Sequence, residues 1–357
     1  MLHALRAFLP MAEKVKVRNP TLPVLNYIAV RDGQMIITGL DNWLTIPVED
    51  ERDYTIPFDL IKQVLKSRPA RLTLDVQKDN HLEIQYDQNT VGCQYLDAAE
   101  YPSVPNEEFK KTGTWTGAMI LQLHQQLRHA ATDELKPALQ GVWVKQEKAH
   151  IQSCTTDGHT LEYIRDLDPD RKGEISGDFE GILSPQCLQI LTRFRIDRTH
   201  VAAGENYIQF CLPHYMVLYS RLIDENYPDF LSILKQETPN AVSVAKKSIL
   251  KALEAAIPCA NKETYLSRLR LQNGSIALFT RDHERNLTFK TAIAHKGHTR
   301  AAMEIGFNLK LLQKTLASIP ADEILWKYRD NHSANLFMAK DDDRQTNLLM
   351  PVRLEED

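Results

Sequence analysis

The residue string that comes nearest to catalytic machinery is Thr155-Thr-Asp-Gly-His159. An aspartate beside a histidine can carry out general acid–base chemistry. However, Asp41 and Asp282 stand at matching points of an internal repeat without a matching histidine. We therefore interpret the string as turn-forming residues after a strand, and we predict that the protein has no catalytic residues and is not an enzyme.

Other reactive groups are scattered along the chain. Thr38-Gly-Leu-Asp41 and Asp166-Leu-Asp-Pro-Asp170 lack EF-hand spacing, and no Gly-rich phosphate loop is present, so we predict no metal and no cofactor. No apolar run approaches the roughly 18 residues of a membrane span. The cysteines never stand in a CxxC spacing, which favours reduced thiols in a cytoplasmic protein. They are Cys93, Cys154, Cys187, Cys211 and Cys259.

A recurrence of about one third of the chain organises these residues. Each third reads as an amphipathic helix, a polar turn, alternating strands, a second helix and more strands. Ser184-Pro185 and Asn308 are typical helix starts, and Asp32-Gly33 predicts an antiparallel hairpin. The predicted helices are 2–18, 58–68, 117–130, 185–195, 246–257 and 308–318.

This pattern predicts an α+β fold of three repeated domains, each with two helices packed on an antiparallel sheet. The predicted domains are 1–112, 113–239 and 240–357. A strand precedes the first helix in the second and third domains, at 113–116 and 241–244, whereas the first domain starts almost directly in its helix. We therefore expect the first domain to lack an edge strand.

Charge is distributed unevenly between helices and the rest of the chain. The net charge of −4 argues against a nucleic-acid partner. Yet the six predicted helices hold fifteen Lys and Arg but only three Asp and Glu, so they carry +12 and the remainder carries −16. Lysine and arginine are good helix formers, but so is the nearly absent glutamate. The bias favours a helical surface that faces a polyanion without sequence specificity.

Six motifs, in this order and spacing, make the chain resemble the β subunit of bacterial DNA polymerase III, the processivity clamp. The resemblance runs nearly end to end. The motifs are Pro20-Thr-Leu-Pro-Val-Leu25, Leu96-Asp-Ala-Ala-Glu-Tyr-Pro102, Thr155-Thr-Asp-Gly-His-Thr-Leu161, Leu218-Tyr-Ser-Arg-Leu-Ile-Asp-Glu-Asn-Tyr-Pro-Asp-Phe230, Met303-Glu-Ile-Gly-Phe-Asn308 and Met350-Pro-Val-Arg-Leu354.

The resemblance implies a head-to-tail homodimer that closes into a ring around double-stranded DNA. Helices would line the hole, and sheets would form the outer wall. DNA polymerase III and other proteins would bind by short linear motifs, and a separate clamp loader would open the ring. A rival interpretation is a clamp-fold paralogue that acts as a protein-interaction module without encircling DNA. A second rival is a nucleic-acid enzyme.

Three groups of site residues follow from the resemblance and the charge pattern. For an apolar cleft that takes partner peptides, the matching residues are Thr156, Gly158, His159, Thr160, Leu161, Pro228, Ile233, Met350, Pro351, Val352, Arg353 and Leu354. Thr160 stands where many members of the family carry a basic residue. For the dimer interface, the matching residues are Val91, Cys93, Ile257 and Pro258.

The third group comprises the residues expected to face DNA. The resemblance points to Arg18, Asn19, Lys136, Gln186 and Asn308, and the helix charge alone adds Lys246, Lys247, Lys251, Lys310 and Lys314.

Overall fold

The computed structural model describes residues 1–147, 150–170, 172–272, 274–297 and 302–354. They form two compact units. Unit 1 comprises Met1–His124, Gln146–Ala149 and Asp168–Asp224, and unit 2 comprises Gln125–Lys145, His150–Leu167 and Glu225–Asp357. None of the helices in the described residues combines the length and apolarity needed to cross a membrane.

All six predicted helices are confirmed. They are α1 (Leu2–Val15), α2 (Phe58–Lys66), α3 (Gly117–Gln126), α5 (Pro185–Thr192), α7 (Lys246–Ala256) and α8 (Leu309–Ser318). Two of the predicted starts are true caps, because the side chain of Ser184 accepts the Cys187 N–H and that of Asn308 accepts the N–H groups of Lys310 and Leu311.

Two short helices were not predicted, α4 (Pro137–Gln140) and α6 (Leu231–Leu234). Pro137 lies at the start of α4, and the strand that follows begins only at Val142. Proline fixes a helical φ and lacks the N–H that a strand ladder needs, which explains the short helix at this point. Single 3₁₀ turns are η1 (Pro23–Asn26), η2 (Ala98–Glu100), η3 (Leu127–His129), η4 (Pro213–Tyr215) and η5 (Ile257–Cys259).

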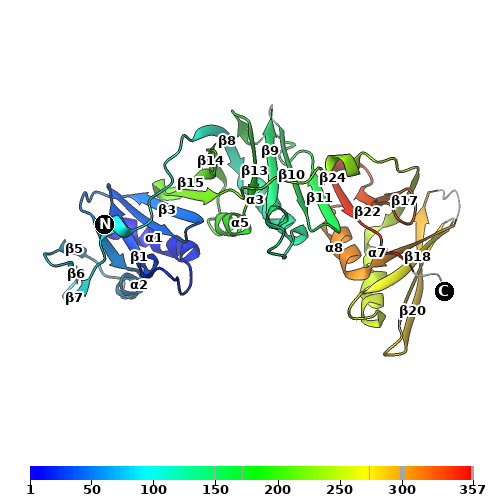
Figure 1. Cartoon of the computed structure of the whole chain (residues 1–357), viewed down its shortest axis with the longest axis horizontal. Helices are drawn as coiled ribbons and strands as arrows, with labels where there is room; N and C mark the ends of the chain where they lie inside the picture. Colours follow the sequence, from blue (N-terminus) through cyan, green and yellow to red (C-terminus); the bar gives the residue numbers. More distant parts are fainter. Residues whose placement is uncertain (148–149, 171, 273, 298–301, 355–357) are drawn as a thin grey trace. The chain divides into compact units, whose positions relative to one another are not determined.

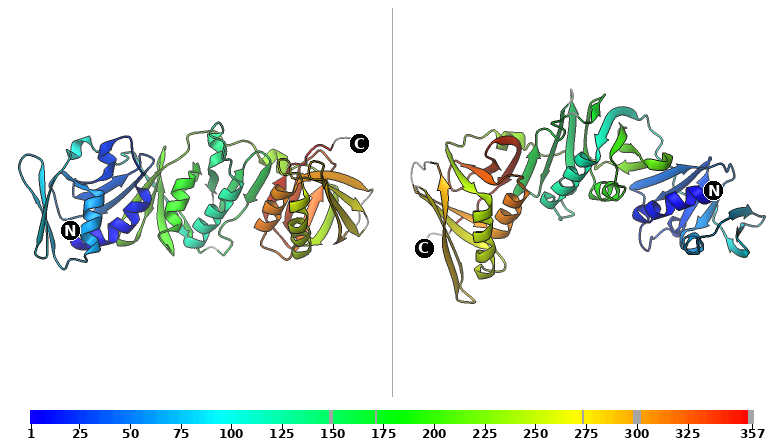
Figure 2. Two further views of the ribbon diagram at one scale, coloured as in Figure 1. Left: turned by 90° about the horizontal axis from the view of Figure 1, so that it is seen from below. Right: turned by 180° about the vertical axis from the view of Figure 1, so that it is seen from behind.

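Unit 1 contains a sheet with the strand order β12-β8-β14-β15-β16-β3-β2-β1-β4 and a separate three-stranded sheet, β5-β6-β7. The predicted Asp32-Gly33 hairpin joins β1 and β2, with both residues at positive φ. Helices α1 and α2 lie together against β1–β4 (Figure 2). The strands are β1 (Tyr27–Arg31), β2 (Gln34–Thr38), β3 (Asn42–Pro47), β4 (Tyr54–Pro57), β5 (Leu72–Val76), β6 (His81–Tyr86), β7 (Asn89–Gln94), β8 (Lys110–Thr116), β12 (Glu174–Ile175), β13 (Phe179–Leu183), β14 (Arg198–Ala203), β15 (Tyr207–Cys211) and β16 (Val217–Arg221).

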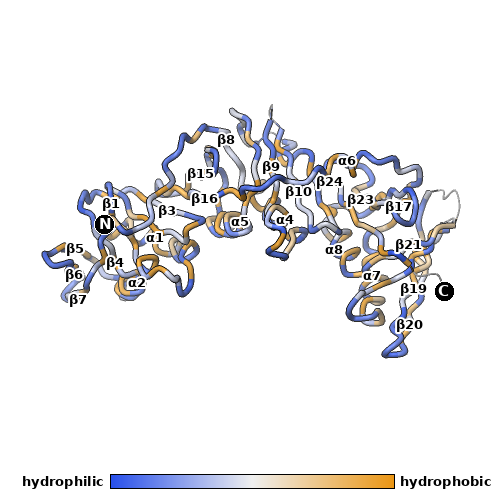
Figure 3. Tube along the Cα trace, viewed as in Figure 1, coloured by the Kyte–Doolittle hydropathy of each residue, from blue (hydrophilic) through white to orange (hydrophobic). Residues whose placement is uncertain are grey.

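In unit 2 the strands follow the order β9-β10-β11-β24-β23-β22-β17-β20-β19-β18-β21. Helices α7 and α8 lie side by side (Figure 1) and bury apolar residues against this sheet, while blue hydrophilic stretches remain along both helices (Figure 3). The strands are β9 (Val142–Glu147), β10 (His150–Thr156), β11 (Thr160–Ile164), β17 (Asn240–Ala245), β18 (Leu266–Gln272), β19 (Ser275–Asp282), β20 (Leu287–Lys296), β21 (Met303–Asn308), β22 (Glu323–Tyr328), β23 (Asn335–Ala339) and β24 (Asp342–Leu349).

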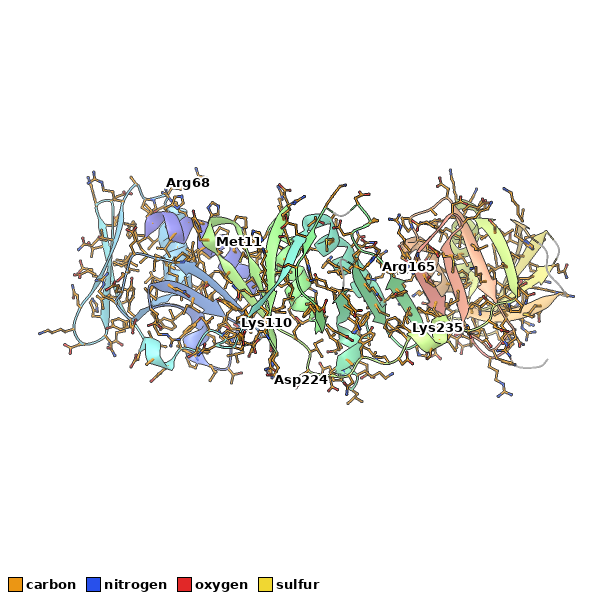
Figure 4. All side chains as sticks on the ribbon, turned by 90° about the horizontal axis from the view of Figure 1, so that it is seen from above. Met11, Arg68, Lys110, Arg165, Asp224 and Lys235 are labelled. Atoms are coloured by element: carbon orange, nitrogen blue, oxygen red, sulfur yellow. The ribbon has the colours of Figure 1, made fainter. Side chains whose placement is uncertain are left out.

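The order of major elements recurs three times. With the short elements α4 and β12 set aside, the same order runs from β8 to β16 and again from β17 to β24: a strand, a helix, three strands, one further strand, a second helix and three strands. The first repeat, from α1 to β7, has no counterpart of β8 or β17 in the described residues. The domain limits stay a prediction. Strand β17 begins at Asn240, the predicted first residue of the third domain. Strand β8 begins at Lys110 (Figure 4), three residues before the predicted start of the second domain at residue 113.

The two units have equivalent junctions between repeats. In unit 1, β3 of the first repeat pairs antiparallel with β16 of the second. In unit 2, β11 of the second repeat pairs antiparallel with β24 of the third. Each junction thus joins the third strand of one repeat to the last strand of the next, which keeps one sheet continuous across two repeats.

Candidate functional site

The turn between β10 and β11 is organised by two side chains. The Thr156 hydroxyl donates to the Thr160 carbonyl at 2.6 Å and accepts the Gly158 N–H at 3.1 Å. Asp157 Oδ1 accepts the N–H groups of His159 at 2.9 Å and Thr160 at 2.6 Å. Together these bonds hold Gly158 and His159 at the exposed tip of the turn.

The structure removes the geometric basis for an Asp–His dyad. The Asp157 carboxylate bonds the backbone of His159, and the imidazole extends into solvent. The sequence analysis placed Asp41, Asp157 and Asp282 at equivalent points of the repeat, and this part of the prediction is wrong. The hairpins close at Thr38–Trp43, Thr156–Leu161 and Asp282–Leu287, so the three aspartates hold different positions in the repeat.

A buried polar chain leads from this turn into the core of unit 2. The Thr160 hydroxyl donates to Asp157 Oδ2 at 2.9 Å and lies 3.1 Å from His129 Nδ1. His129 Nε2 in turn lies 3.2 Å from Glu162 Oε2, with both side chains buried. Thr160 is therefore a buried link between the turn and η3 rather than a solvent-facing side chain.

Lys314 on α8 binds the opposite end of this polar network, at Asp157. Its Nζ donates to Asp157 Oδ2 at 2.9 Å, and both side chains are largely covered. Burial raises the pKa of Asp157, but the Lys314 ammonium and the backbone N–H groups outweigh it and hold that pKa below its ordinary value. Asp157 is thus an anion at neutral pH and a fixed acceptor for the turn.

The segment after β24 lies against the same turn. The Met350 N–H donates to the His159 carbonyl at 2.9 Å, and the Val352 N–H donates to the Gly306 carbonyl at 2.8 Å. Gly306 permits this approach, because a Cβ there would overlap the Val352 carbonyl and the Leu354 side chain. Val352 and Arg353 remain exposed.

Pro228 and Ile233 lie in the segment that ends in α6, just before Lys235 (Figure 4). Phe230 fastens this segment to the sheet, because its ring packs at 5.2 Å from that of Trp143 on β9 and at 5.4 Å from that of Tyr163 on β11. Ile233 and Val352 keep 45% and 37% of their surface exposed. Exposed apolar residues of this kind can anchor an apolar partner.

The structure thus joins most of the predicted cleft residues but not all. Residues 156–161 and 350–352 are connected by backbone hydrogen bonds, and Pro228 and Ile233 reach the same sheet through Phe230. Four residues that hold these segments in place were not predicted to do so: Asp157, His129 and Phe230 were not singled out as site residues, and Lys314 was expected to face DNA. Asp157 stood inside a quoted motif, but its partners lie far along the chain.

The residues expected to face DNA fall into both units. In unit 1, exposed Arg18 and Asn19 follow α1, and exposed Gln186 lines a groove of about 260 Å³ between the end of α1 and α5. Three basic residues share this groove: Lys14, Lys16 and Arg193.

In unit 2, Lys247 and Lys251 are exposed and line a hollow of about 930 Å³ beside α7. Lys136 and Lys310 are also exposed, and Lys310 lies 3.8 Å from the centre of the Tyr265 ring.

Three other candidates in unit 2 are already engaged. The Lys246 ammonium donates to the Ala317 carbonyl at the end of α8 at 3.1 Å. Asn308 uses both ends of its amide, as helix cap and as donor to the Thr264 carbonyl at 2.8 Å. Lys314 is paired with Asp157.

The four residues expected at a dimer interface lie on or beside two strand edges. Val91 and Cys93 lie on β7, the last strand of the β5-β6-β7 sheet. Ile257 and Pro258 lie in η5, which contacts β20. Burial raises the pKa of the Cys93 thiol, so it is protonated at neutral pH and behaves as a small apolar group.

No family model matches the chain. Among curated proteins, the chain is similar to the beta sliding clamp of Synechocystis sp., with 23% identity over 97% of this chain and 96% of that protein. The beta sliding clamp of Pseudomonas aeruginosa is 22% identical with the same coverage.

Solved structures give the same result. The DNA polymerase III subunit beta from Pseudomonas aeruginosa aligns with a TM-score of 0.82 and 20% identity over 98% of both chains. The DNA polymerase sliding clamp from Bacillus subtilis aligns with a TM-score of 0.82 and 21% identity over 97% of this chain and 96% of that one. The chain therefore has the fold of the bacterial β sliding clamps and resembles them in sequence over nearly its whole length.

Proposed function

We propose that this protein is a DNA sliding clamp, a non-enzymatic cytoplasmic ring that encircles double-stranded DNA and tethers DNA polymerase III and other partners. The observation that carries the proposal is the repeated junction in which β3 pairs with β16 and β11 pairs with β24. Continuing the same rule assigns β20, the third strand of the last repeat, to β7, the last strand of the first. Within one chain these two strands are not paired with each other.

Both strands have edges that can accept such a partner. β7 is the terminal strand of its sheet, and β20 pairs with β17 at only two positions, Lys296 and His295. A second copy of the chain can therefore dock head to tail through β20 and β7. Two such heterologous contacts close a ring and remove both edges. Val91 and Cys93 on β7, and Ile257 and Pro258 beside β20, fit this interface.

The exposed basic residues on the helices support DNA as the enclosed ligand. Lys247 and Lys251 on α7, Lys310 on α8, and Lys14 and Arg193 in the unit 1 groove fit a sequence-independent phosphate contact. Lys246 and Lys314, by contrast, are assigned a mainly structural role because their ammonium groups are already bonded inside unit 2.

The partner-peptide cleft is proposed at the turn 157–160, the α6 segment and the residues after β24. Its support is the joining of these segments to one sheet and the exposed apolar side chains of Ile233 and Val352. Replacing either with aspartate should weaken binding of peptides tiled from the same organism's DNA polymerase III, measured by fluorescence anisotropy. Leu22→Asp is the matched control, because Leu22 is 47% exposed but lies in unit 1.

Stimulation of polymerase processivity on circular primed DNA, with and without a clamp loader, tests the whole proposal. We expect stimulation that needs the loader and that falls when Lys247 and Lys251 are both changed to glutamate. The control Lys111→Glu changes an exposed lysine on β8, outside both the basic helices and the proposed cleft. If the purified chain neither dimerises nor stimulates synthesis with a loader from the same organism, the alternative of a protein-interaction module that does not encircle DNA takes its place.

A further inference from the structure

We propose that Lys314 is a positioning residue of the partner-peptide cleft, which holds the turn 157–160 in its binding geometry through Asp157. This inference rests on the cleft assigned under the proposed function. It gives Lys314 a role different from that of the other lysines on the basic helices. The turn presents Gly158 and His159, and the carboxylate that fixes its backbone is the one that Lys314 contacts.

The geometry makes Asp157 the centre of the turn. Its Oδ1 is saturated by the N–H groups of His159 and Thr160, while Oδ2 accepts the Thr160 hydroxyl at 2.9 Å and the Lys314 ammonium at 2.9 Å. The ammonium is the only cation of the described residues that lies within ion-pair distance of this carboxylate. Without it, a largely covered anion would have lost its counter-charge, which favours protonation or movement of the turn.

The internal repeat supplies a natural comparison. Thr38 forms the same two hydrogen bonds as Thr156, to the carbonyl of Asn42 and from the N–H of Leu40. This equivalence places Gly39 at the position of Asp157. Since Ser184 and Asn308 both cap their helices, Ile190 on α5 likewise stands at the position of Lys314 on α8.

Both members of the ion pair are therefore replaced together at the other junction. Gly39 and Ile190 line the same groove in unit 1, where no carboxylate and ammonium meet at these two positions. The fold alone thus does not require the pair. It occurs at the junction that also has the exposed apolar side chains of Ile233 and Val352 and the residues after β24.

A double-mutant cycle tests the proposal on the full-length protein. The variants are Lys314→Met, Asp157→Asn and the two combined, with the strongest-binding tiled polymerase peptide as the probe. We expect each single change to weaken peptide binding about three- to ten-fold, in the range of a partly buried ion pair, and the combined change to be no worse than either alone. Lys314→Arg should restore most of the affinity, and Lys340→Met, which removes the ion pair with Glu323 elsewhere in unit 2, should leave it unchanged.

Urea unfolding of every variant separates positioning from general loss of structure. Additive effects of the two single changes, or a loss of affinity that merely follows the unfolded fraction, would overturn the role of Lys314. Equal peptide affinity in all variants would do the same while leaving the proposed function intact. Failure of the unaltered protein to bind any tiled peptide would instead reject the cleft itself.

Discussion

Leu349, the last residue of β24, pairs across the junction with Thr160, the first residue of β11. The two residues come from different repeats, yet Leu349 is fully buried in the core cluster of the third repeat and Thr160 is fully buried in the turn network. This pair therefore couples the packing of one repeat to the turn geometry of the other. A one-residue shift of β24 against β11 would move buried side chains to the other face of the sheet, so this pair fixes the register of the β11–β24 ladder.

Leu349→Ala should lower the free energy of unfolding by about 2–5 kcal/mol, because it leaves a cavity in a closely packed core. The urea midpoint should fall, with little change in the denaturant dependence. Leu22→Ala, at an exposed site in unit 1, should stay within about 0.5 kcal/mol of the unaltered protein. Equal midpoints for the two variants would show that the junction contributes no more than the surface does.

Thr160→Val and Thr155→Val should have opposite outcomes although both threonines are buried. The Thr160 hydroxyl bridges Asp157 and His129, so its loss leaves the buried His129 Nδ1 without this partner and should cost about 1–3 kcal/mol. The Thr155 hydroxyl has no hydrogen-bond partner among the described residues, so valine there should be neutral or stabilising. Thermal unfolding measures the melting temperatures of the two variants. A lower melting temperature for Thr155→Val than for Thr160→Val would contradict the prediction.

The fold could be predicted because its signals are local. Helical spacing, the caps Ser184 and Asn308, and the Asp32-Gly33 turn each act within a few residues, and each is confirmed. The site could be predicted only in part. The link from Asp157 to Lys314 spans 157 residues of sequence, and the hairpin registers that misaligned Asp41 and Asp282 depend on strand pairing, which periodicity does not reveal.

The ion pair of Asp157 predicts a pH dependence of stability. Because its pKa is lowered from the ordinary 3.8 in the folded protein, the stabilisation is present above about that pH and is lost as the pH falls through the folded value. The stability difference between the unaltered protein and Asp157→Asn should therefore be constant near neutrality and shrink below pH 4. Unfolding midpoints between pH 3 and 7 measure it, and a difference that grows on acidification would contradict the assignment.

Gly306→Ala should detach the segment after β24 without disturbing the distant core. A Cβ at this position meets the Val352 carbonyl and the Leu354 side chain, so the bridge from the Val352 N–H to the Gly306 carbonyl must open. We expect weaker binding of the polymerase peptide and faster proteolysis at the C-terminal segment. Gly274→Ala is a steric control outside the cleft, because a Cβ there meets no atom within 4 Å, although its φ of +78° adds local strain. Undiminished peptide binding by Gly306→Ala would show that the segment does not contribute to the cleft.

Ring closure can be tested at a single amide of β7. Tyr86 and Asn89 close a two-residue hairpin, and Gln85 faces Thr90 at the next position of the ladder. Because hydrogen-bonded and non-hydrogen-bonded pairs alternate in an antiparallel ladder, the Thr90 N–H is directed to the outer edge of β7 and not to β6. Proline at residue 90 removes this donor while sparing the pairing within the chain.

Thr90→Pro should therefore convert a dimer into a 40.9 kDa monomer and abolish loader-dependent stimulation of synthesis. It should retain peptide binding, because the proposed cleft lies in unit 2 and β7 lies in unit 1. Thr90→Ala keeps the N–H and should remain dimeric. Sedimentation at micromolar concentration distinguishes these states. A dimer that survives Thr90→Pro with normal stability would place the contact between copies somewhere other than the β7 edge, and the rule that pairs β3 with β16 and β11 with β24 would then not extend to β20 and β7.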